Sequence, residues 1–321
     1  MKAVHYRRYG SPEVIRVEEV DVPVPGEGEV LVRVRAASLN AYDWHVLTAD
    51  IFLVRFMGGG FFMPTDPRLG TDVAGVVEAV GSGVSEFNVG DRVFGMVKGG
   101  FAEYACAQAR AFVPMPVNAS FESAAAVPLA GVTALQGLRD AGGITAGQKV
   151  LVNGASGGVG TFAVQIAKAF DTEVTAVCST WNVEQALEIG ADHVIDYTRD
   201  DFTVNGVAYD LVFAANGYRT LSAYKRSLAP RGVYVMAGGT PAQIFQSMLF
   251  GSLMSEKGGR RLTGFMARSS RDDLMALKDL FEDGSILPVI DRRFSLMETA
   301  SAMEYLGKGH ARGKTVILMD G

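Results

Sequence analysis

The sequence predicts an α/β protein in which a doubly wound parallel sheet is joined to a smaller all-β domain. Three observations support this prediction. A glycine-rich turn at residues 153–160 separates an apolar strand from a helix, strands and helices alternate after that turn, and apolar residues alternate in steps of two in the first hundred residues. With 321 residues, the chain is long enough for two domains that each bury a core.

The first domain is predicted from the two-residue alternation. In residues 28–38, the side chains of Val30, Val32 and Val34 share one face, as in a strand with one side in a core. Glycine and proline turns separate similar short strands, which we expect at residues 3–6, 73–80, 92–95 and 102–107. An alanine-rich helical stretch at residues 121–139 then leads into the second domain.

The second domain begins with a strand at residues 149–152 and a helix at residues 161–170. The βαβ rhythm continues with a helix at 183–189 and with strands at 173–177, 193–195, 209–213 and 232–237. In the turn between the first strand and helix, Gly154, Gly157 and Gly160 allow a close approach of the backbone, so that helix N–H groups hold a pyrophosphate. Because glycines also occupy tight turns for steric reasons alone, the spacing by itself leaves a purely structural alternative open.

The last part of the chain is expected to return to the first domain. After a strand at 261–266 the sequence predicts, in order, a helix at 271–282, a strand at 289–294, a helix at 297–307 and a strand at 314–319. The predicted boundaries are therefore 1–120 for the first domain, 121–266 for the cofactor-binding domain and 267–321 for the returning segment.

Composition and charge exclude several classes of function. The net charge is −5, from 30 basic and 35 acidic residues without a polybasic block, so we expect no nucleic-acid partner. The first residues lack the apolar core of a signal peptide, which favours a cytoplasmic location. Residues 237–255 carry no charge but are too polar and broken to cross a bilayer, so we expect no membrane insertion and interpret them as a surface or interface segment.

Metal ligands are scarce in the sequence. It contains two cysteines, which excludes a four-cysteine zinc site within one chain, and four scattered histidines without an HExxH spacing. We therefore predict no metal site.

Eight motifs spread over nearly the whole chain carry a family resemblance. They are SLNAYDWH (38–45), GTDVAGVVEAVG (70–81), GDRVFG (90–95), GGFAEYA (99–105), AAAVPLAGVTALQGL (124–138), NGASGGVGTFAVQIAK (153–168), GADHVIDY (190–197) and GHARGKTVI (309–317). Together they resemble the zinc-independent, quinone oxidoreductase-like branch of the medium-chain dehydrogenase/reductase superfamily. The resemblance implies a GroES-like β-barrel catalytic domain and a Rossmann domain. In the zinc-dependent relatives a ligand cysteine lies near the position of Ser38 and a ligand histidine follows the glycine at position 70, and neither is present here.

The resemblance implies a reductase that passes hydride from a nicotinamide ring to a small-molecule acceptor, such as a quinone or an α,β-unsaturated carbonyl. Hydride delivery needs the acceptor stacked about 3–3.5 Å from the ring, and the charge that develops on its oxygen needs a hydrogen-bond donor. Two alternatives stay open at this point: a non-catalytic, redox-responsive nucleotide-binding protein, and a zinc-free alcohol dehydrogenase. The resemblance also implies a homodimer, which is common in this branch.

Three residues after the 28–38 strand are the catalytic candidates. Asn40 and Asp43 match the branch's Asn-x-x-Asp pattern, which lines the nicotinamide and substrate pocket. Histidine is a common general acid, so His45 could donate a proton to an enolate. The alternatives are that Asn40 and Asp43 cap a helical turn and that His45 is structural. Residues 46–48 lack the arginine that some quinone reductases of this branch carry, which weakens the case for a quinone as the true substrate.

NADPH is the predicted cofactor, with NADH as a second possibility. Residues 177–182, which follow the second strand of the βαβ domain, contain no acid to hold the ribose hydroxyls, so a 2′-phosphate is not repelled there. Ser179 and Thr180 could accept the phosphate, with Tyr197 beside the adenosine. Similar sequences commonly have an arginine where Trp181 stands, so the positive charge would have to come from a later residue: Arg199, Arg312 or Lys314.

The full set of predicted cofactor-binding residues follows from the motifs and from the carboxyl ends of the predicted strands. A packing role is the alternative for those outside the glycine-rich turn. The set is Thr133, Ser156, Gly157, Gly158, Val159, Ser179, Thr180, Tyr197, Asn216, Gly217, Gly238, Phe265 and Lys314. The apolar segment 51–63, centred on three glycines, is interpreted as a lid, with a buried hairpin or a dimer contact as the alternative.

Overall fold

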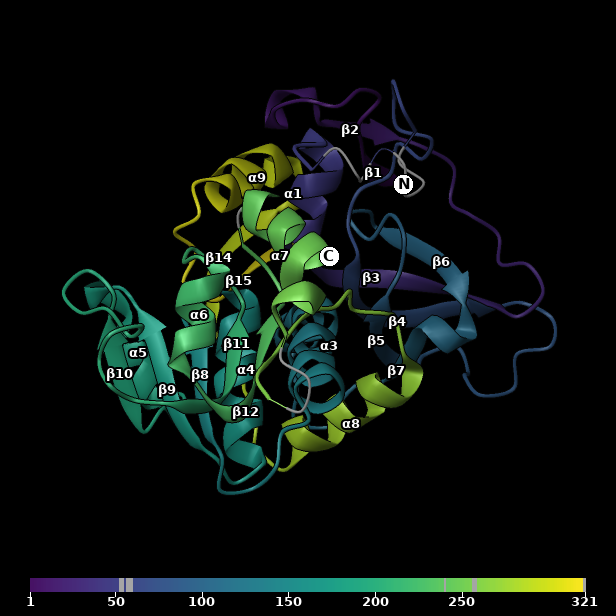
Figure 1. The fold of residues 1–321 in the computed structure, drawn as a ribbon. Helices are drawn as coiled ribbons and strands as arrows, with labels where there is room; N and C mark the ends of the chain where they lie inside the picture. The colour runs from purple at the N-terminus through teal and green to yellow at the C-terminus, as the bar shows by residue number, and fades with distance from the viewer. Residues whose placement is uncertain (52–54, 56–59, 240, 256–258, 320–321) are drawn as a thin grey trace. The chain divides into compact units, whose positions relative to one another are not determined.

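The computed structural model describes residues 1–51, 55, 60–239, 241–255 and 259–319. The chain divides into two compact units (Figure 1). Unit 1 consists of Met1–Leu129, Ser269–Glu282 and Ile290–Gly321, and unit 2 consists of Ala130–Arg268 and Asp283–Val289. Most of the segment 51–63 that we interpreted as a lid lies outside the described residues.

Unit 2 is built on a six-stranded sheet in which every strand pair is parallel (Figure 1). Its order is β10-β9-β8-β11-β12-β13, so the first strand of the unit lies in the middle and the chain winds outward from it in both directions. The predicted doubly wound fold is thereby confirmed. The strands are β8 (Lys149–Asn153), β9 (Glu173–Cys178), β10 (His193–Asp196), β11 (Tyr209–Ala214), β12 (Leu228–Met236) and β13 (Arg261–Gly264).

The helices of unit 2 cover a sheet that is apolar on both faces. In β8, Val150, Leu151 and Val152 are all fully buried, as expected for a parallel sheet between two layers of helices. The helices are α3 (Pro128–Gln136), whose first two residues belong to unit 1, the π-type turn η4 (Gly137–Gly142), α4 (Gly158–Ala169), the 3-10 turn η5 (Thr180–Asn182), α5 (Val183–Glu188), α6 (Leu221–Ser227) and α7 (Pro241–Met254).

Unit 1 is dominated by antiparallel strands. A two-stranded ribbon pairs β1 (Lys2–His5) with β2 (Arg16–Glu19). The main sheet has the order β14-β15-β3-β4-β5-β7, and β6 pairs with the first half of β3. Its strands are β3 (Glu29–Leu39), β4 (Asp72–Val80), β5 (Arg92–Met96), β6 (Tyr104–Gln108), β7 (Phe112–Pro114), β14 (Ile290–Ser295) and β15 (Lys314–Leu318).

The core of unit 1 contains the side chains predicted from the alternation. Val30, Val32 and Val34 lie in one buried cluster with Phe101 and Ile317. The helices of this unit are η1 (Pro12–Val14), α1 (Ala41–Thr48), η3 (Ala109–Ala111), α2 (Phe121–Ala126), α8 (Arg271–Glu282), η6 (Leu296–Glu298) and α9 (Thr299–Gly307).

The stretch 121–139, predicted as one helical run, divides between the two units. Helix α2 ends at Ala126 and α3 begins at Pro128, whose missing N–H and fixed φ suit a first helical turn. Because α2 packs on β3 and β4, the compact unit 2 starts at Ala130 rather than at the predicted position 121.

A second difference lies in the returning segment. Residues 283–289 belong to unit 2, because Leu287 donates its N–H to Gln165 Oε1 at 2.7 Å and accepts from Gln165 Nε2 at 3.0 Å.

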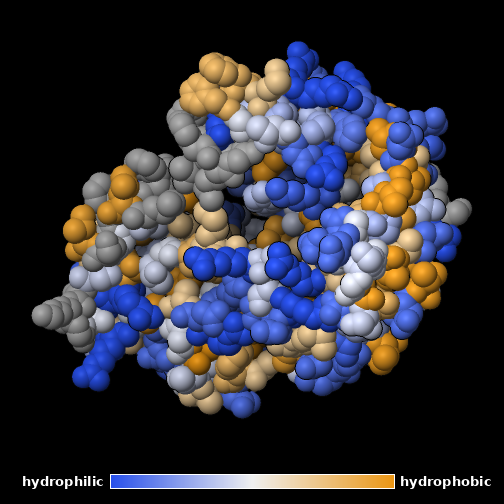
Figure 2. All heavy atoms as spheres, turned by 90° about the vertical axis from the view of Figure 1, so that its right-hand side faces the viewer, coloured by the Kyte–Doolittle hydropathy of each residue, from blue (hydrophilic) through white to orange (hydrophobic). Residues whose placement is uncertain are grey.

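Residues 237–255, interpreted as a surface or interface segment, contain helix α7. Within the part of the chain that the structure describes, no helix is both long and apolar enough to cross a membrane. On the face drawn in Figure 2, hydrophilic residues predominate and the hydrophobic ones lie in separate small groups.

Candidate functional site

The three glycines from the end of β8 to the first turn of α4 have separate structural roles. Gly154 has a positive φ of 82°, and a Cβ there would lie 2.9 Å from the backbone nitrogen of Asn216. A Cβ on Gly160 would overlap the carbonyl oxygen of Gly154. A Cβ on Gly157 would meet nothing closer than 3.7 Å, so this glycine borders open space. Gly154 and Gly160 therefore shape the turn, whereas Gly157 leaves room for a ligand.

Open space at Gly157 coincides with the N-terminus of a long buried helix. Gly157 is the N-cap of α4, whose first-turn amides include those of Gly158, Val159 and Gly160. These amides have no acceptor within the helix, and the helix dipole places positive potential there. The arrangement fits a diphosphate, which is the ligand predicted from the sequence.

Asn182 connects the glycine turn to the end of the neighbouring strand. Its side-chain amide donates to Ser156 Oγ at 3.2 Å and to Ser179 Oγ at 3.1 Å. The two predicted serines are thus held together by a residue that sequence reasoning did not select. The only available signal was its place at the N-cap of α5, at the end of the short turn η5 that follows β9.

A carboxylate also lies beside the predicted phosphate-accepting hydroxyls. Asp196, the last residue of β10, is the register partner of Cys178 at the end of β9. Its Oδ2 accepts a hydrogen bond from Thr180 Oγ1, and its Oδ1 accepts from Thr198 Oγ1 at 2.7 Å. The inference that no acid lies near this position was therefore incomplete, because the acid comes from the next strand of the sheet rather than from residues 177–182.

Asp196 is well suited to carry a negative charge. The pKa of its carboxyl lies below the usual value, chiefly because Thr180 donates a hydrogen bond to it and also because Thr198 does. Arg199 is its nearest cationic partner among the described ion pairs, with Nε 3.6 Å from Oδ2.

The remaining predicted cofactor residues of unit 2 follow the strands in order. Tyr197 comes after β10 and is 46% exposed, with its ring 5.6 Å from that of Tyr218. Asn216 and Gly217 follow β11, Gly238 follows β12 and Phe265 follows β13. Because all six strands are parallel, these residues lie along one edge of the sheet.

Packing accounts for some of these positions. A Cβ on Gly238 would overlap the carbonyl oxygen of Ala215, and a Cβ on Gly137 would lie 2.9 Å from the ring of Phe265. Thr133 is on α3 and is partly buried. The cofactor contacts of Thr133, Gly238 and Phe265 stay predictions.

In unit 1, the end of β3 meets the starts of β4 and β15. The register pairs Ser38 with Asp72 and Leu39 with Thr315, the residue after Lys314. The side chains of Asn40, Asp43, Asp72 and Lys314 are brought together there, and all four residues are buried.

Hydrogen bonds connect this buried cluster internally. Asp72 Oδ2 accepts from Asn40 Nδ2 at 2.9 Å and from Ser38 Oγ at 3.1 Å, and it lies 3.6 Å from Lys314 Nζ. Lys314 also donates to the carbonyl oxygen of Leu39 at 2.9 Å and to Asn40 Oδ1. The ammonium of Lys314, one of the predicted sources of positive charge for the 2′-phosphate, therefore already contacts acceptors inside unit 1.

Asp43 performs the capping role that the sequence left as an alternative. Its Oδ2 accepts from the N–H of Asn40, the N-cap of α1, at 2.8 Å, and its Oδ1 accepts from Thr71 Oγ1 at 3.1 Å. Burial, reinforced by the charge of Asp72, raises the pKa of Asp43 to about 7. Burial also raises the pKa of Asp72 and lowers that of Lys314.

His45 lies two residues beyond Asp43 on α1, and its ring contacts the carboxylate of Asp50. Its Nδ1 is 2.8 Å from Asp50 Oδ1, and its side chain is 23% exposed. Within the described part of the chain, Nε2 makes no hydrogen bond that the structure records, so one ring nitrogen is fixed while the other is available for a substrate.

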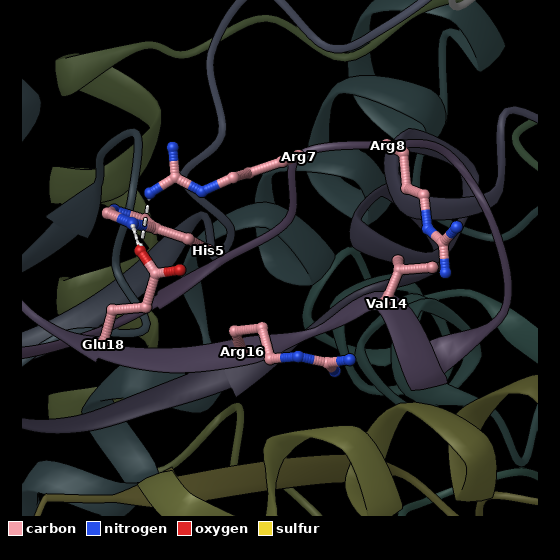
Figure 3. Close-up of a pocket in the computed structure, with 6 residues that line it drawn as sticks. All are labelled: His5, Arg7, Arg8, Val14, Arg16 and Glu18. Carbon is pink, nitrogen blue, oxygen red and sulfur yellow. Dashed lines mark hydrogen bonds and ion pairs between the residues drawn. The ribbon is translucent and has the colours of Figure 1, made fainter.

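One surface pocket in unit 1 involves none of the predicted residues. It is lined by His5, Arg7, Arg8, Val14, Arg16 and Glu18, on and around the β1–β2 ribbon (Figure 3). Glu18 Oε2 accepts from Arg7 Nη2 at 2.7 Å and lies 3.0 Å from His5 Nδ1. Within residues 1–51, 55, 60–239, 241–255 and 259–319, no group of three or more His, Cys, Asp or Glu side chains is arranged to hold a metal ion.

Comparison with known proteins agrees with this architecture. Residues 26–117 match the alcohol dehydrogenase GroES-like domain, and residues 189–317 match a family described as zinc-binding dehydrogenase. A chloroplastic quinone oxidoreductase, QR1, of Triphysaria versicolor is 33% identical over 99% of this chain and 98% of its own length. A chloroplastic NADPH-dependent alkenal/one oxidoreductase of Arabidopsis thaliana is 33% identical over 99% of this chain and 79% of its own length.

Solved structures give the same result. The quinone oxidoreductase of Coxiella burnetii superposes with a TM-score of 0.86 at 29% identity, covering 100% of this chain and 99% of its own. The Escherichia coli quinone oxidoreductase complexed with NADPH superposes with a TM-score of 0.82 at 25% identity, covering 99% of this chain and 100% of its own. The chain therefore belongs to the medium-chain dehydrogenase/reductase superfamily, in its quinone oxidoreductase-like branch, and is an oxidoreductase.

Proposed function

We propose that this chain is a metal-independent reductase that uses NADPH, and also NADH, to reduce a quinone, an α,β-unsaturated carbonyl or a related carbonyl acceptor. The observation that carries the proposal is the open space at Gly157, in front of the N-terminus of α4. The names of the Arabidopsis thaliana and Escherichia coli relatives support NADPH as a donor.

The nucleotide is assigned to the carboxyl edge of the unit 2 sheet. Its diphosphate is assigned to Ser156, Gly157, Gly158 and Val159, its adenosine half to Ser179, Thr180 and Tyr197, and its nicotinamide half to Thr133, Asn216, Gly217, Gly238 and Phe265. When bound, the reduced nicotinamide supplies the hydride. We leave Lys314 out of this set, because its buried ammonium already contacts Leu39, Asn40 and Asp72.

His45 is the proposed proton donor to the reduced acceptor. Asp50 holds Nδ1, which orients the ring and leaves Nε2 as the donating nitrogen. Asn40 and Asp43 are positioning residues in this proposal, because they fix the first turn of the helix that carries His45.

The residues at the end of β3 do not fit a zinc ion. Ser38 and Thr71, which stand where the sequence comparison expects the zinc ligands of related enzymes, both use their hydroxyls as donors to carboxylates. The ammonium of Lys314 lies 3.6 Å from one of these carboxylates, that of Asp72. We therefore expect prolonged dialysis against a chelator to leave the rate of NADPH oxidation unchanged, whereas a loss of activity that zinc restores would contradict the proposal.

The test is direct consumption of NADPH and NADH with a panel of quinones, enones and aldehydes. Turnover with at least one acceptor class is the expected result. Nucleotide binding without turnover on any acceptor would favour the non-catalytic alternative, and faster oxidation of an alcohol with NADP⁺ would favour a dehydrogenase. The homodimer and the cytoplasmic location stay predictions; the two relatives described above are named as chloroplastic proteins.

A further inference from the structure

We propose that Asp196 limits the preference of this chain for NADPH over NADH, because its carboxylate lies beside the hydroxyls that would receive the 2′-phosphate. The inference rests on the proposed function, since it assumes that a pyridine nucleotide binds along this edge of the sheet. It assigns a specificity-determining role to a residue at the end of β10.

The position of Asp196 follows from the parallel register. In many NAD-binding sheets the acid that holds the ribose hydroxyls follows the second strand, which here is β9. In this chain β9 ends at Cys178 without an acid, and the adjacent strand β10 ends at Asp196, directly across from Cys178. The carboxylate thus reaches the same end of the sheet from the neighbouring strand.

The hydrogen bonds of Asp196 engage one of the two hydroxyls assigned to the 2′-phosphate, that of Thr180. The 2′-phosphate of NADPH is a dianion when it binds. Its oxygens can then only accept hydrogen bonds, so the protein must supply the donors. The single hydroxyl proton of Thr180 is donated to Asp196 Oδ2, and the hydroxyl of Thr198 is donated to Oδ1. A ribose 2′-hydroxyl is different, because it can itself donate to a carboxylate.

Charge acts in the same direction as hydrogen bonding. The Asp196 side chain is 12% exposed, so its charge is only partly screened by solvent. Arg199 offsets it incompletely, since its Nε is 3.6 Å from Oδ2 and its own side chain is 73% exposed. Asn182, at the start of α5, is uncharged, and Trp181 before it is exposed and uncharged.

Asp196 also stabilises a local turn. The experiment must therefore distinguish the loss of this turn from the loss of the charge beside the 2′-phosphate. Its Oδ1 accepts from the N–H of Thr198 at 3.0 Å, which closes a turn after β10. Asp201 closes a matching turn, because its Oδ1 accepts from the N–H of Thr203 at 2.9 Å and from Thr203 Oγ1 at 2.8 Å. Asp201→Asn therefore removes the same charge from the same kind of turn.

The experiment is a calorimetric titration of the native chain, Asp196→Asn and Asp201→Asn with NADPH and with NADH at low salt. The measured quantity is the ratio of the two dissociation constants, Kd(NADH)/Kd(NADPH). We expect this ratio to rise by about tenfold or more in Asp196→Asn, from the removal of one charge beside a phosphate dianion. In Asp201→Asn we expect it to stay within about twofold of the native value, and 0.5 M salt should reduce the effect of Asp196→Asn.

Asp196→Ser, which keeps an acceptor for the Thr198 amide, should shift the ratio in the same direction. An unchanged ratio in both Asp196 variants, with both nucleotides still bound, would overturn the inference and leave the proposed function intact. An equal rise of the ratio in Asp201→Asn would also overturn the inference, because the ratio would then depend on the net charge of the chain and not on the position of Asp196. Failure of the native chain to bind either nucleotide would contradict the proposed function itself.

Discussion

At the scale of single residues, the buried cluster at the end of β3 makes the stability of this protein depend on pH. Asp43 and Asp72 are two buried carboxyls that share one nearby ammonium, that of Lys314. With one cation for two acids, burial raises the pKa of both carboxyls, and Asp43 reaches about 7. The cluster therefore retains a proton under conditions in which an unfolded aspartate has lost it.

The stability of the native chain should fall as pH rises through this range. The pKa of Asp43 is about 7 in the folded chain and near 3.8 in the unfolded chain, so the folded state binds one proton more between these values. The contribution of Asp43 to the free energy of unfolding is then largest below about pH 4 and is lost as pH rises to about 7. Urea unfolding at pH 5 and pH 7.5 measures it, and Asp43→Asn should show a smaller fall between the two. An equal fall in both proteins would contradict the assigned pKa.

The role of His45 is tested by a substitution that keeps its shape. His45→Gln removes the imidazole that would donate the proton and should lower turnover by roughly 10²-fold or more, while the affinity for NADPH stays unchanged. His310→Gln, at an exposed histidine before β15, is the matched control and should retain native turnover. An unchanged rate in His45→Gln would remove this residue from the mechanism.

The sequence predicts that Asn40, Asp43 and Lys314 belong to functional sites, but it does not predict the contacts that they make with Asp72 and its neighbours. Asn40 and Asp43 were selected from a motif, and the structure adds that both face Asp72 or its neighbours across a strand pair. Lys314 and Asp72 are far apart in the chain, and only the pairing of β3 with β4 and β15 brings them together. Such contacts depend on long-range strand register, which local patterns do not encode.

At the scale of elements, the turn between β8 and α4 separates folding from binding. Gly160 contacts the backbone of its own turn, whereas Gly157 borders open space. The same substitution at the two positions should therefore have different effects.

Gly157→Val should weaken binding of NADPH and NADH by at least about tenfold, because the new side chain fills the space assigned to the diphosphate. Its free energy of unfolding should change by less than about 1 kcal/mol, the range of an altered helix N-cap. Gly160→Val should instead destabilise the fold by roughly 1–3 kcal/mol or more through overpacking. Urea unfolding and nucleotide titration of both variants provide the two measurements, and equal losses of stability would contradict the separation.

Regular elements were the most predictable part of this fold. The strands of unit 2 were located from short apolar runs, because a sheet buried on both faces requires them. Helices α6 and α7 and strands β2 and β7 were not predicted, since they lack a clear periodicity or are only a few residues long. The acid at the end of β10 could not be predicted from residues 177–182, because the parallel register brings it to the end of β9 from a different strand.

At the scale of the whole molecule, nucleotide binding should increase the free energy of unfolding of the chain. The residues assigned to the nucleotide all lie in unit 2, and the proposed proton donor lies in unit 1. A ligand that binds only the folded state stabilises it in proportion to the logarithm of its concentration.

Saturating NADPH should accordingly raise the free energy of unfolding by about 2.7 kcal/mol at a concentration 100 times its dissociation constant. The measurement is thermal unfolding followed across a series of NADPH concentrations. Gly157→Val serves as the control, because it should fold normally and show little shift at the same concentrations. A native melting temperature that does not depend on NADPH would contradict nucleotide binding.

The most direct test of the central claim is a crystal structure of the chain grown with NADPH or NADH. The account predicts a diphosphate beside Gly157, on the amides of Gly158 and Val159, with the adenosine ribose beside Ser179, Thr180 and Asp196. A nucleotide bound elsewhere, or no bound nucleotide at millimolar concentration, would contradict it.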